Sequence, residues 1–345
     1  MRTVWLLLAV ALAPYLDAGV GEPGKRYAVV TPRDEGVIAT GINGRGEVVG
    51  FAWAEDQGRP GVLEQRPFLA RGKAMTYLPL LGGYTATSPA ALSDGGRVVG
   101  RASKPARPGV PVRLRNQGFV WDAATGIRGL GAPEGDSASF ACGVSRDGRR
   151  VSGFAVGDGR SRACVWDLDG TEARSSGVKV RVLPHATRLG SNTVAISGGG
   201  THVAAVDGVS PCLWTAGASG GWTREVIGGP GSLIPRAVND SGTVVGLRFA
   251  GDGLTHAVIW TRGGGLVPTG EPPGYVRSEA NAVNNAGVVV GLIDGPNGSK
   301  TGPSAFVYES GRVRVLVEGG PAFASATAIN DRGEVAGVFE KDEGR

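Results

Sequence analysis

Short apolar runs alternate along the chain with Gly, Asn, Asp and Ser, and one nine-residue phrase of this kind recurs seven times. The last copy reads Ile329-Asn330-Asp331-Arg332-Gly333-Glu334-Val335-Ala336-Gly337. In every copy an apolar residue is followed by Asn or Ser, and Gly stands four residues after the apolar one. Three such positions kept along one chain indicate an internal repeat. The apolar residues that open the copies are Ile42, Leu92, Val144, Ile196, Val238, Val283 and Ile329.

Each phrase predicts a β-hairpin. The Asn, Asp or Ser side chain opens a turn by bonding to nearby backbone, and Gly supplies the positive φ that a short bulged hairpin requires. A Val-rich strand follows, as in Val244-Val245-Gly246. Two more strands complete the repeat, an aromatic one such as Val258-Ile259-Trp260 and one after a Gly-rich turn such as Val313-Arg314-Val315-Leu316. We therefore expect four strands per repeat, a to d.

The repeat length predicts an all-β fold, a seven-bladed β-propeller of four-stranded blades. The repeat Gly residues are 50, 52, 52, 42, 45 and 46 positions apart, and four strands per roughly 45 residues is the period of a propeller blade. The last copy supplies only strands a and b, at 326–340. We expect the N-terminal strand 27–30 to close that blade as strand d, because closure removes exposed edges. No third strand is apparent, so this blade is expected to be three-stranded or the chain to be incomplete.

The repeat is similar to a known sequence pattern. The combination Ala-Ile-Asn-x-x-Gly-x-Val-Val-Gly with a following Ala-Phe-x-Trp strand resembles the HAF repeat of exported, mainly bacterial proteins. The resemblance covers about residues 26–340. Thr255-His256-Ala257-Val258 keeps the His of the name-giving triplet, and Ser304-Ala305-Phe306 keeps its last two residues. The resemblance implies export and a propeller-like fold, and it implies no reaction.

The N-terminus predicts a signal peptide at residues 1–18, ahead of a repeat domain at 22–345. Arg2 precedes an apolar run from Val4 to Ala13 and then small residues, as in secretory signals. As a helix the run would span about 15 Å, too short for a bilayer core of about 30 Å. A secreted or periplasmic protein without a transmembrane segment after signal removal is expected. The alternative is that the run is a buried first strand or helix.

Charge and cysteine content narrow the function without naming it. The net charge is +5 and the pI about 9.3, which does not indicate a nucleic-acid partner. Cys164 and Cys212 fall where other repeats carry Phe or Val, so they are predicted to be core residues rather than members of a disulfide framework. We expect no cofactor and a monomer.

Metal and catalytic signatures are also weak. His185, His202 and His256 fall on different blades or opposite faces of the predicted propeller, which disfavours a His-based metal site or triad. Asp240 and Asp331 invite a calcium interpretation, but each turn offers one carboxylate and Ca²⁺ takes six to eight oxygens. Turn chemistry explains these acids better, and no metal site is predicted.

Candidate ligand-binding residues gather on the face of the b-to-c and d-to-a loops, opposite the a-to-b turns. From 101 to 165 eleven Arg or Lys and five Asp or Glu leave a local net charge of +6. Solvated loop charge is the plainer interpretation of this excess. Arg236 and Glu279, on adjacent repeats, are expected to form a structural salt bridge or a ligand contact, and Asn281 lies beside them. The loop aromatics could stack on sugar rings or simply fill gaps between blades. The basic candidates are Arg101, Lys104, Arg107 and Arg113, and the aromatic ones are Trp53, Tyr84, Tyr275 and Phe323.

These features favour an exported binding or interaction module for a cell-envelope or extracellular polymer, such as an anionic glycan, over an enzyme. One alternative is a propeller-based lyase or hydrolase that uses Arg236 and Glu279 at the channel mouth. A second alternative is a structural scaffold. A deep mouth with converging polar groups would favour the enzyme, and a broad shallow face would favour binding.

Overall fold

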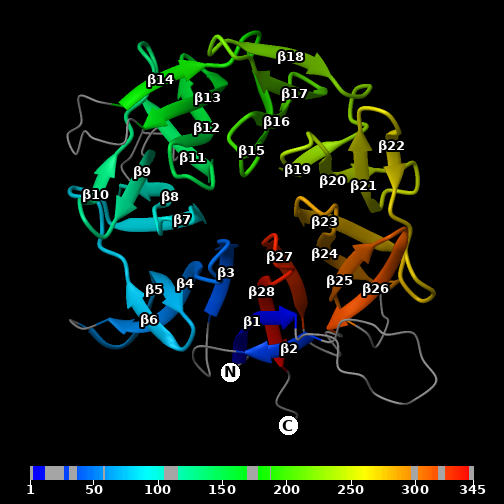
Figure 1. Ribbon diagram of the computed structural model, residues 1–345. Coiled ribbons are helices and arrows are strands. Elements are labelled where there is room, and N and C mark those ends of the chain that lie inside the picture. Colours follow the sequence, from blue (N-terminus) through cyan, green and yellow to red (C-terminus); the bar gives the residue numbers. More distant parts are fainter. Residues whose placement is uncertain are drawn as a thin grey trace.

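The chain forms four-stranded antiparallel sheets arranged radially around a central axis (Figure 1). The computed structural model describes residues 3–11, 27–30, 37–56, 59–104, 116–168, 178–186, 188–296, 302–317 and 323–341. The predicted all-β propeller with four-stranded antiparallel blades is confirmed. In the part of the chain that the structure describes, no helix has the length and apolar character needed to cross a membrane.

Six sheets, blades 1 to 6, each use four consecutive strands, ordered here from the axis outward as a to d. Blade 1 holds β3 (Val37–Ile42), β4 (Val48–Asp56), β5 (Arg59–Arg71) and β6 (Ala74–Tyr77). Blade 2 holds β7 (Ala86–Leu92), β8 (Val98–Ser103), β9 (Asn116–Asp122) and β10 (Gly126–Gly129). Blade 3 holds β11 (Ala138–Val144), β12 (Arg150–Gly157), β13 (Arg160–Leu168) and β14 (Val178–Val182).

The other three blades repeat this plan. Blade 4 holds β15 (Leu189–Ile196), β16 (His202–Asp207), β17 (Ser210–Ala216) and β18 (Trp222–Val226). Blade 5 holds β19 (Ile234–Val238), β20 (Val244–Phe249), β21 (Thr255–Thr261) and β22 (Gly265–Pro268). Blade 6 holds β23 (Arg277–Val283), β24 (Val289–Asp294), β25 (Ser304–Glu309) and β26 (Arg312–Val317).

A further sheet, the closing sheet, joins the two ends of the chain. Its order from the axis outward is β27 (Ala324–Ile329), β28 (Val335–Lys341), β1 (Thr3–Ala11) and β2 (Tyr27–Val30). β2 occupies the outermost place, as expected of strand d. The expectation that the third place has no strand is wrong, because β1 fills it and pairs antiparallel with both β28 and β2. The apolar N-terminal run thus lies in a sheet, where the alternative interpretation puts it.

The a-to-b turns follow the predicted chemistry. The turn Gly has positive φ in every copy, for example 77° at Gly46 and 80° at Gly333. Asn43 Oδ1 accepts hydrogen bonds from Arg45 N and Glu47 N, at 3.0 and 2.9 Å. Because the side chain satisfies the turn backbone locally, the nine-residue phrase folds into the same hairpin wherever it occurs.

A β-bulge in each inner strand explains the Gly that ends the Val-Val-Gly run. In blade 1 the pairing of β3 with β4 shifts between Ala39 and Gly41, which pushes Ile38 O toward the second strand. A Cβ at Gly50 would lie only 1.9 Å from that oxygen, so only Gly fits. The skipped residues, called the bulge ring, are Thr40, Ala90, Cys142, Arg236, Asn281 and Thr327.

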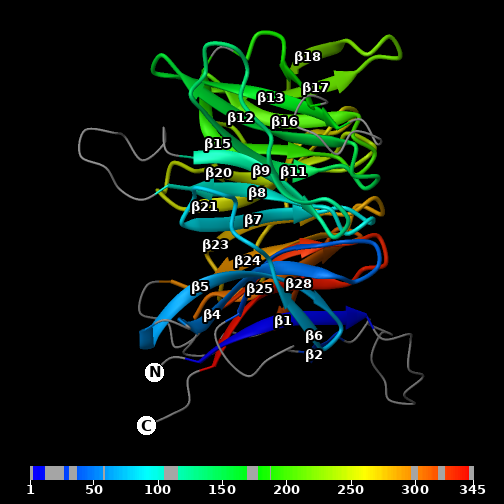
Figure 2. The same ribbon diagram turned by 90° about the vertical axis from the view of Figure 1, so that its left-hand side faces the viewer.

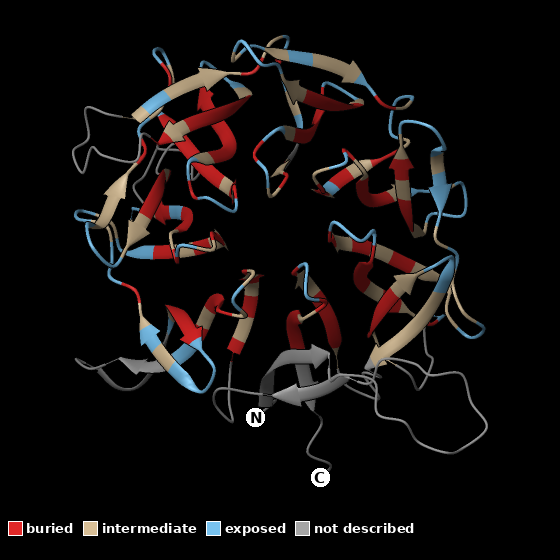
Figure 3. Ribbon diagram, viewed as in Figure 1, coloured by how far each residue is buried: buried red, intermediate tan, exposed pale blue. Residues whose placement is uncertain are grey.

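Burial is greatest in strands b and c and lowest in the outermost strand d (Figure 3). Strands b and c are covered on both faces by neighbouring blades, so both valines of runs such as Val244-Val245 are buried. Trp166 and Trp214 on strand c are fully buried and pack in blade-to-blade clusters. Cys164 and Cys212 are buried free thiols, which confirms their predicted role as small core residues.

The strands run across the thickness of the disc, so every connection lies on one of two faces (Figure 2). The turn face carries the a-to-b turns. The loop face carries the b-to-c and d-to-a connections. The two faces present very different chemistry around the axis.

Candidate functional site

The turn face is closed by hydrogen bonds that run from each turn to the next. Asn239 Nδ2 donates to Asn284 O at 3.0 Å, and Asn284 Nδ2 donates in turn to Asn330 O at 3.2 Å. Asn330 Nδ2 donates to Asn43 O at 2.8 Å, which links the last copy of the phrase to the first. The recurring Asn therefore stabilises its own turn through Oδ1 and holds the neighbouring blade through Nδ2.

In the copies of the phrase that have Ser instead of Asn, no side-chain amide is present to bond the next blade. Ser145 Oγ still accepts from Arg150 N at 2.9 Å and so stabilises its own turn. The shorter hydroxyl cannot span to the next blade, and an Arg just before strand b reaches it instead. Arg97 Nη1 donates to Gly148 O at 2.8 Å, and Arg150 Nη1 donates to Gly200 O at 3.0 Å.

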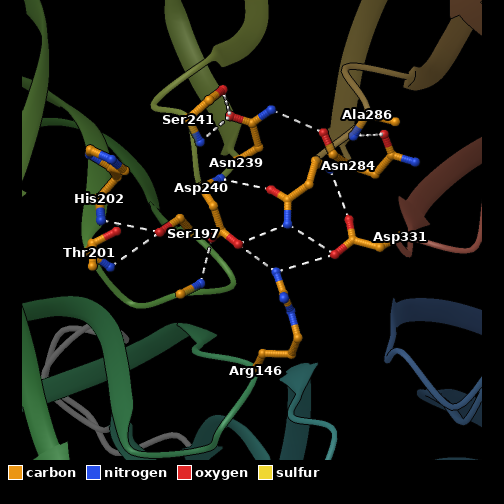
Figure 4. Close-up of polar contacts among 12 residues, drawn as sticks. Arg146, Ser197, Thr201, His202, Asn239, Asp240, Ser241, Asn284, Ala286 and Asp331 are labelled. Carbon is orange, nitrogen blue, oxygen red and sulfur yellow. Dashed lines mark hydrogen bonds and ion pairs between the residues drawn. The ribbon is translucent and has the colours of Figure 1, made fainter.

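The residue that follows the phrase Asn or Ser points toward the axis. Arg146 Nη2 lies 2.6 Å from Asp240 Oδ2 and 3.3 Å from Asp331 Oδ2 (Figure 4). Asn285 Nδ2 bonds the same two carboxylates at 2.8 and 3.0 Å. These residues come from blades 3, 5 and 6 and the closing sheet, so their side chains meet across the axis. This contact is called the turn-face bridge.

The turn-face bridge also shifts proton equilibria. Burial alone would raise the pKa of Asp240, but hydrogen bonds from Gly199 N, Asn285 and Arg146 outweigh burial and lower it. Asp240 therefore stays ionised and paired with Arg146. Asp240 and Asp331 are thus used in contacts between repeats and across the axis rather than in their own turns, which differs from the turn chemistry that the sequence predicts. Among the described residues, no group of three or more His, Cys, Asp or Glu is placed to hold a metal ion.

The loop face contains the candidate functional site, a cavity of about 680 Å³ at blades 1 to 4. Its walls are the starts of inner strands, the ends of strands b and the starts of strands c. A volume of this size is typical of a small-molecule site. The described lining residues are Thr40, Phe51, Ser88, Pro89, Ala90, Arg101, Asn116, Phe140, Ala141, Cys142, Phe154, Val156, Ser161 and Thr193.

Arg101 is the single charged residue among those lining residues. It stands on β8, its residue is exposed, and no described carboxylate pairs with it. Asn116, on the neighbouring β9 two positions from the residue opposite Arg101, is buried and accepts a hydrogen bond from Ser103 Oγ at 2.7 Å. A guanidinium without a carboxylate partner, beside an oriented amide, is suited to bind a carboxylate through charge-assisted hydrogen bonds.

The other walls are aromatic or weakly polar. Phe140 and Phe154 stack with ring centroids 4.4 Å apart. Hydroxyls of Ser88, Ser161 and Thr193 surround the hollow. Enclosure raises the pKa of the Cys142 thiol to about 11, an effect that the nearby Arg101 charge only partly offsets. Cys142 is therefore neutral near pH 7 and is not a nucleophile.

The predicted aromatic sector does not converge on this cavity. Trp53 is exposed within β4 and is not among the lining residues. Tyr84 packs against the core cluster of blades 1 and 2, hydrogen-bonds Gln117, and carries Lys104 Nζ 5.0 Å from its ring centroid. Tyr275 packs between blades 5 and 6, and Phe323 lies half-buried before β27. Tyr84 and Tyr275 thus fill gaps between blades, which is the second role the sequence offered.

Arg236 and Glu279 do meet, with Arg236 Nη2 3.9 Å from Glu279 Oε2. Arg236 lines a separate pocket of about 270 Å³ on the turn side of the axis. Asn281 Nδ2 donates to Ala326 O at 2.9 Å and so joins blade 6 to the closing sheet. Of the basic candidates, Arg101 lines the loop-face cavity and Lys104 sits over Tyr84, while Arg107 and Arg113 lie outside the described residues.

Sequence reasoning missed most of the cavity wall. Asn116, Phe140, Phe154 and Cys142 were not candidates, because strand residues of an expected core carry no signal that they face a hollow. The bulge ring did have a signal in the sequence. Each Val-Val-Gly run lies on strand b, and its Gly faces the bulge of the neighbouring inner strand. Reading that Gly as a close backbone approach would have located the ring.

Two histidines lie on opposite faces with opposite electrostatics. On the loop face, the hydrogen bond to Glu271 raises the pKa of His256, and Asp252 adds to this effect; the ring nitrogens lie 2.9 and 3.3 Å from those carboxylates. On the turn face, burial and the Arg262 charge lower the pKa of His202. Neither His lines the loop-face cavity.

Comparison with known proteins shows the fold alone. No family model and no curated protein sequence matches the chain. Among solved structures, the chain is similar to the β-propeller domain of the trilobed protease from Pyrococcus furiosus, with TM-score 0.54 and 10% identity over 89% of this chain and 94% of that one. It is similar to acylaminoacyl peptidase from Pyrococcus horikoshii, with TM-score 0.53 and 10% identity over 86% of this chain.

TolB from Acinetobacter baumannii has TM-score 0.48 and 14% identity over 85% of this chain. The chain spans 66% of that TolB and about half of the peptidase, 48% of its length. The β-propeller architecture is supported by the trilobed-protease domain and the acylaminoacyl peptidase, whose TM-scores exceed 0.5.

Proposed function

We propose that this chain is an exported β-propeller binding module that holds an anionic glycan of the cell envelope or extracellular space in the loop-face cavity. One observation carries the proposal. Arg101 is an exposed cation without a described carboxylate partner, in a hollow whose other described walls are uncharged. A ligand that supplies a carboxylate would complete this arrangement.

The walls fit a uronic-acid sugar. Its carboxylate would bind the Arg101 guanidinium, its hydroxyls would exchange hydrogen bonds with groups such as Ser88 and Thr193, and its C–H face would pack on the phenyl ring of Phe140. An uncharged sugar would leave Arg101 without a counter-ion, and a nucleic acid would need more than one lining cation to neutralise its phosphates. The cavity chemistry therefore favours a carboxylate sugar.

A binding role is favoured over the lyase or hydrolase alternative. That alternative placed Arg236 and Glu279 at a channel mouth, whereas Arg236 lines the turn-side pocket and neither residue lines the loop-face cavity. Within the cavity the described lining residues include no acidic group to act as general acid or base. Cys142, the one thiol there, is neutral near pH 7.

We also propose that the closing sheet completes a seven-bladed ring of HAF-type repeats and that residues 1–18 direct export. Seven copies of the phrase and the shared sheet of both chain ends support the ring. Cleavage would remove β1 and leave β27, β28 and β2. Mass spectrometry of the protein recovered outside the cytoplasm should show an N-terminus near residue 19, and an intact Met1 there would contradict the signal peptide.

The binding proposal is tested by Arg101→Met, titrated calorimetrically with oligogalacturonates at low salt. The affinity should fall about tenfold or more, because a charge-assisted hydrogen bond contributes about 1.5–3 kcal/mol. Stability should change by less than about 0.5 kcal/mol, since the side chain is exposed. Arg160→Met is the matched control, an exposed Arg of the same face outside the cavity, and Trp53→Ala is the aromatic control.

Both controls should bind as the wild type does. Absence of wild-type binding to every uronate oligomer, or equal affinity of Arg101→Met and wild type, would overturn the proposal.

A further inference from the structure

The loop-face cavity continues along the axis toward the turn face. It shares Thr40, Ala90 and Cys142 with the turn-side pocket. All three belong to the bulge ring, which therefore marks the junction of the two hollows. The hollow above the junction measures about 680 Å³ and the one below about 270 Å³, so the larger space lies on the loop-face side.

The turn-face bridge closes the inner end of this passage. Arg146 on blade 3 reaches Asp240 on blade 5 and Asp331 of the closing sheet, at 2.6 and 3.3 Å (Figure 4). Because these blades are not neighbours in the ring, the ion pairs must cross the axis. Asn285 Nδ2 bonds both carboxylates as well. Among the described residues, the passage is thus open on the loop face and closed on the turn face.

Charge is ordered along the passage. Arg101 stands at the mouth, Arg236 at the bulge ring is paired with Glu279, and Asp240 and Asp331 lie at the closed end with Arg146 between them. Asp94 lines the same end, so one Arg stands against three carboxylates and that end is net negative. An anionic chain is therefore attracted at the mouth and repelled from the floor.

From this geometry we infer that the cavity receives the terminus of an anionic oligosaccharide, end-on, and not an internal stretch of the polymer. The inference rests on the proposed function. A polymer that enters by its end needs one opening, whereas an internal residue needs an entry and an exit for the chain on both sides. In the part of the chain that the structure describes, only the loop-face mouth is available, and a stiff sugar chain cannot fold back through it.

A length and end-block series tests the inference. Oligogalacturonates from the monomer to the hexamer are titrated calorimetrically, together with hexamers modified by a bulky label at the reducing end or the non-reducing end. The affinity should rise over the first residues and then stay constant within about twofold. One of the two labels should lower it about tenfold or more, because a blocked end cannot enter.

Ala90→Phe tests the same inference from the protein side. Ala90 is a half-buried small residue on the wall shared by both hollows, and a phenyl ring there would fill the place where the chain end seats. The hexamer affinity should fall about tenfold or more, while Ala90→Ser should bind as the wild type does. Circular dichroism and the melting temperature confirm that both variants fold.

The outcomes separate the two proposals. Affinity that increases with every added residue and ignores both end labels would overturn end-on binding and leave the carboxylate-binding cavity in place. If folded Ala90→Phe kept full affinity for the hexamer while Arg101→Met lost it, end-on binding would likewise be overturned and the carboxylate-binding cavity would stand. No binding of any oligomer by the wild type would overturn the proposed function itself.

Discussion

The turn face and the loop face of this propeller are made by the same seven repeats and yet differ in kind. On the turn face, polar side chains are satisfied by neighbouring turns, as when Asn239 reaches Asn284 and Asn284 reaches Asn330. On the loop face, the connections vary in length and leave a cavity with Arg101 lacking a described carboxylate partner. The difference teaches that the repeated residues close the ring, and that the unrepeated ones create a place for a ligand.

The largest expected effect is on the turn face, for Asn330→Ala. Asn330 is buried; its Oδ1 accepts from Arg332 N and Glu334 N, and its Nδ2 donates to Asn43 O. Removing it leaves buried backbone groups unpaired and should lower the free energy of unfolding by about 3 kcal/mol. Chemical denaturation measures this loss.

Asn330→Ser is the internal control for that experiment. Ser serves in the equivalent place of three repeats, where it stabilises its own turn, as Ser145 does by accepting from Arg150 N. The variant should lose about half as much stability, because the bonds of the amide nitrogen to Asn43 O and Glu334 Oε2 disappear while the turn stays satisfied. Equal stability of Asn330→Ala and wild type would show that the turn-to-turn bonds do not hold the ring.

Arg146→Gln should have a smaller effect, about 1 kcal/mol near pH 7, since the ion pairs are half-exposed. The pKa of Asp240 is lowered in the folded protein. Its stabilising contribution is therefore present above the unfolded pKa, about 3.9, and is lost as the pH falls through the lower folded value. In Arg146→Gln the folded pKa of Asp240 lies closer to the unfolded one, so the stability lost to this group in acid should be smaller than in the wild type. Denaturation midpoints measured down the acid range check this, and an unchanged acid profile would contradict the bridge.

The smallest expected effect concerns two histidines, one on each face, whose pKa values shift in opposite directions. His256, on the loop face, has a raised pKa, so its contribution is full below about pH 6.5 and is lost as the pH rises through the folded value. His202, on the turn face, has a lowered pKa, so its contribution is present above about pH 6.5 and is lost as the pH falls. NMR titration of the imidazole protons should place His256 above His202.

The variant His256→Gln should lack the NMR titration with the higher pKa, which assigns that titration to His256. Glu271→Gln should lower the pKa of His256 and leave that of His202 unchanged, because the Glu271 hydrogen bond is the main cause of the shift. The reverse order of the two histidines would contradict the electrostatic contrast between the faces.

Much of the fold is predictable because it depends on local chemistry. The Asn or Ser turn, the Gly with positive φ and the Val-rich strand lie within nine residues, so each copy specifies its hairpin without help from the others. The spacing of the copies then predicts four strands per blade. The pairing of β1 with β28 was not predictable, because an apolar run such as Thr3–Ala11 carries the same pattern in a signal peptide and in a strand of a sheet.

The candidate site was predictable only in part. Arg101 was identified from the excess of basic residues around it, and the meeting of Arg236 and Glu279 from their equivalent places in adjacent repeats. The predicted aromatic residues do not line the loop-face cavity, and Tyr84 and Tyr275 pack into the apolar boundaries between blades. Burying a large aromatic ring between blades gains free energy for folding, so such a ring packs into the core wherever the tertiary structure offers space.

By itself the sequence determined the hairpin of each repeat, the number of repeats and the small residues at close contacts, since all of these follow from sterics and hydrogen bonds between near neighbours. Tertiary structure decided which residues face each other across the axis. Arg146, Asp240 and Asp331 are far apart in the chain, and they meet only because the blades curve into a ring of a particular radius. The same curvature, together with the bulges of the inner strands, decided that a cavity opens around Arg101 on one face while the other face is closed.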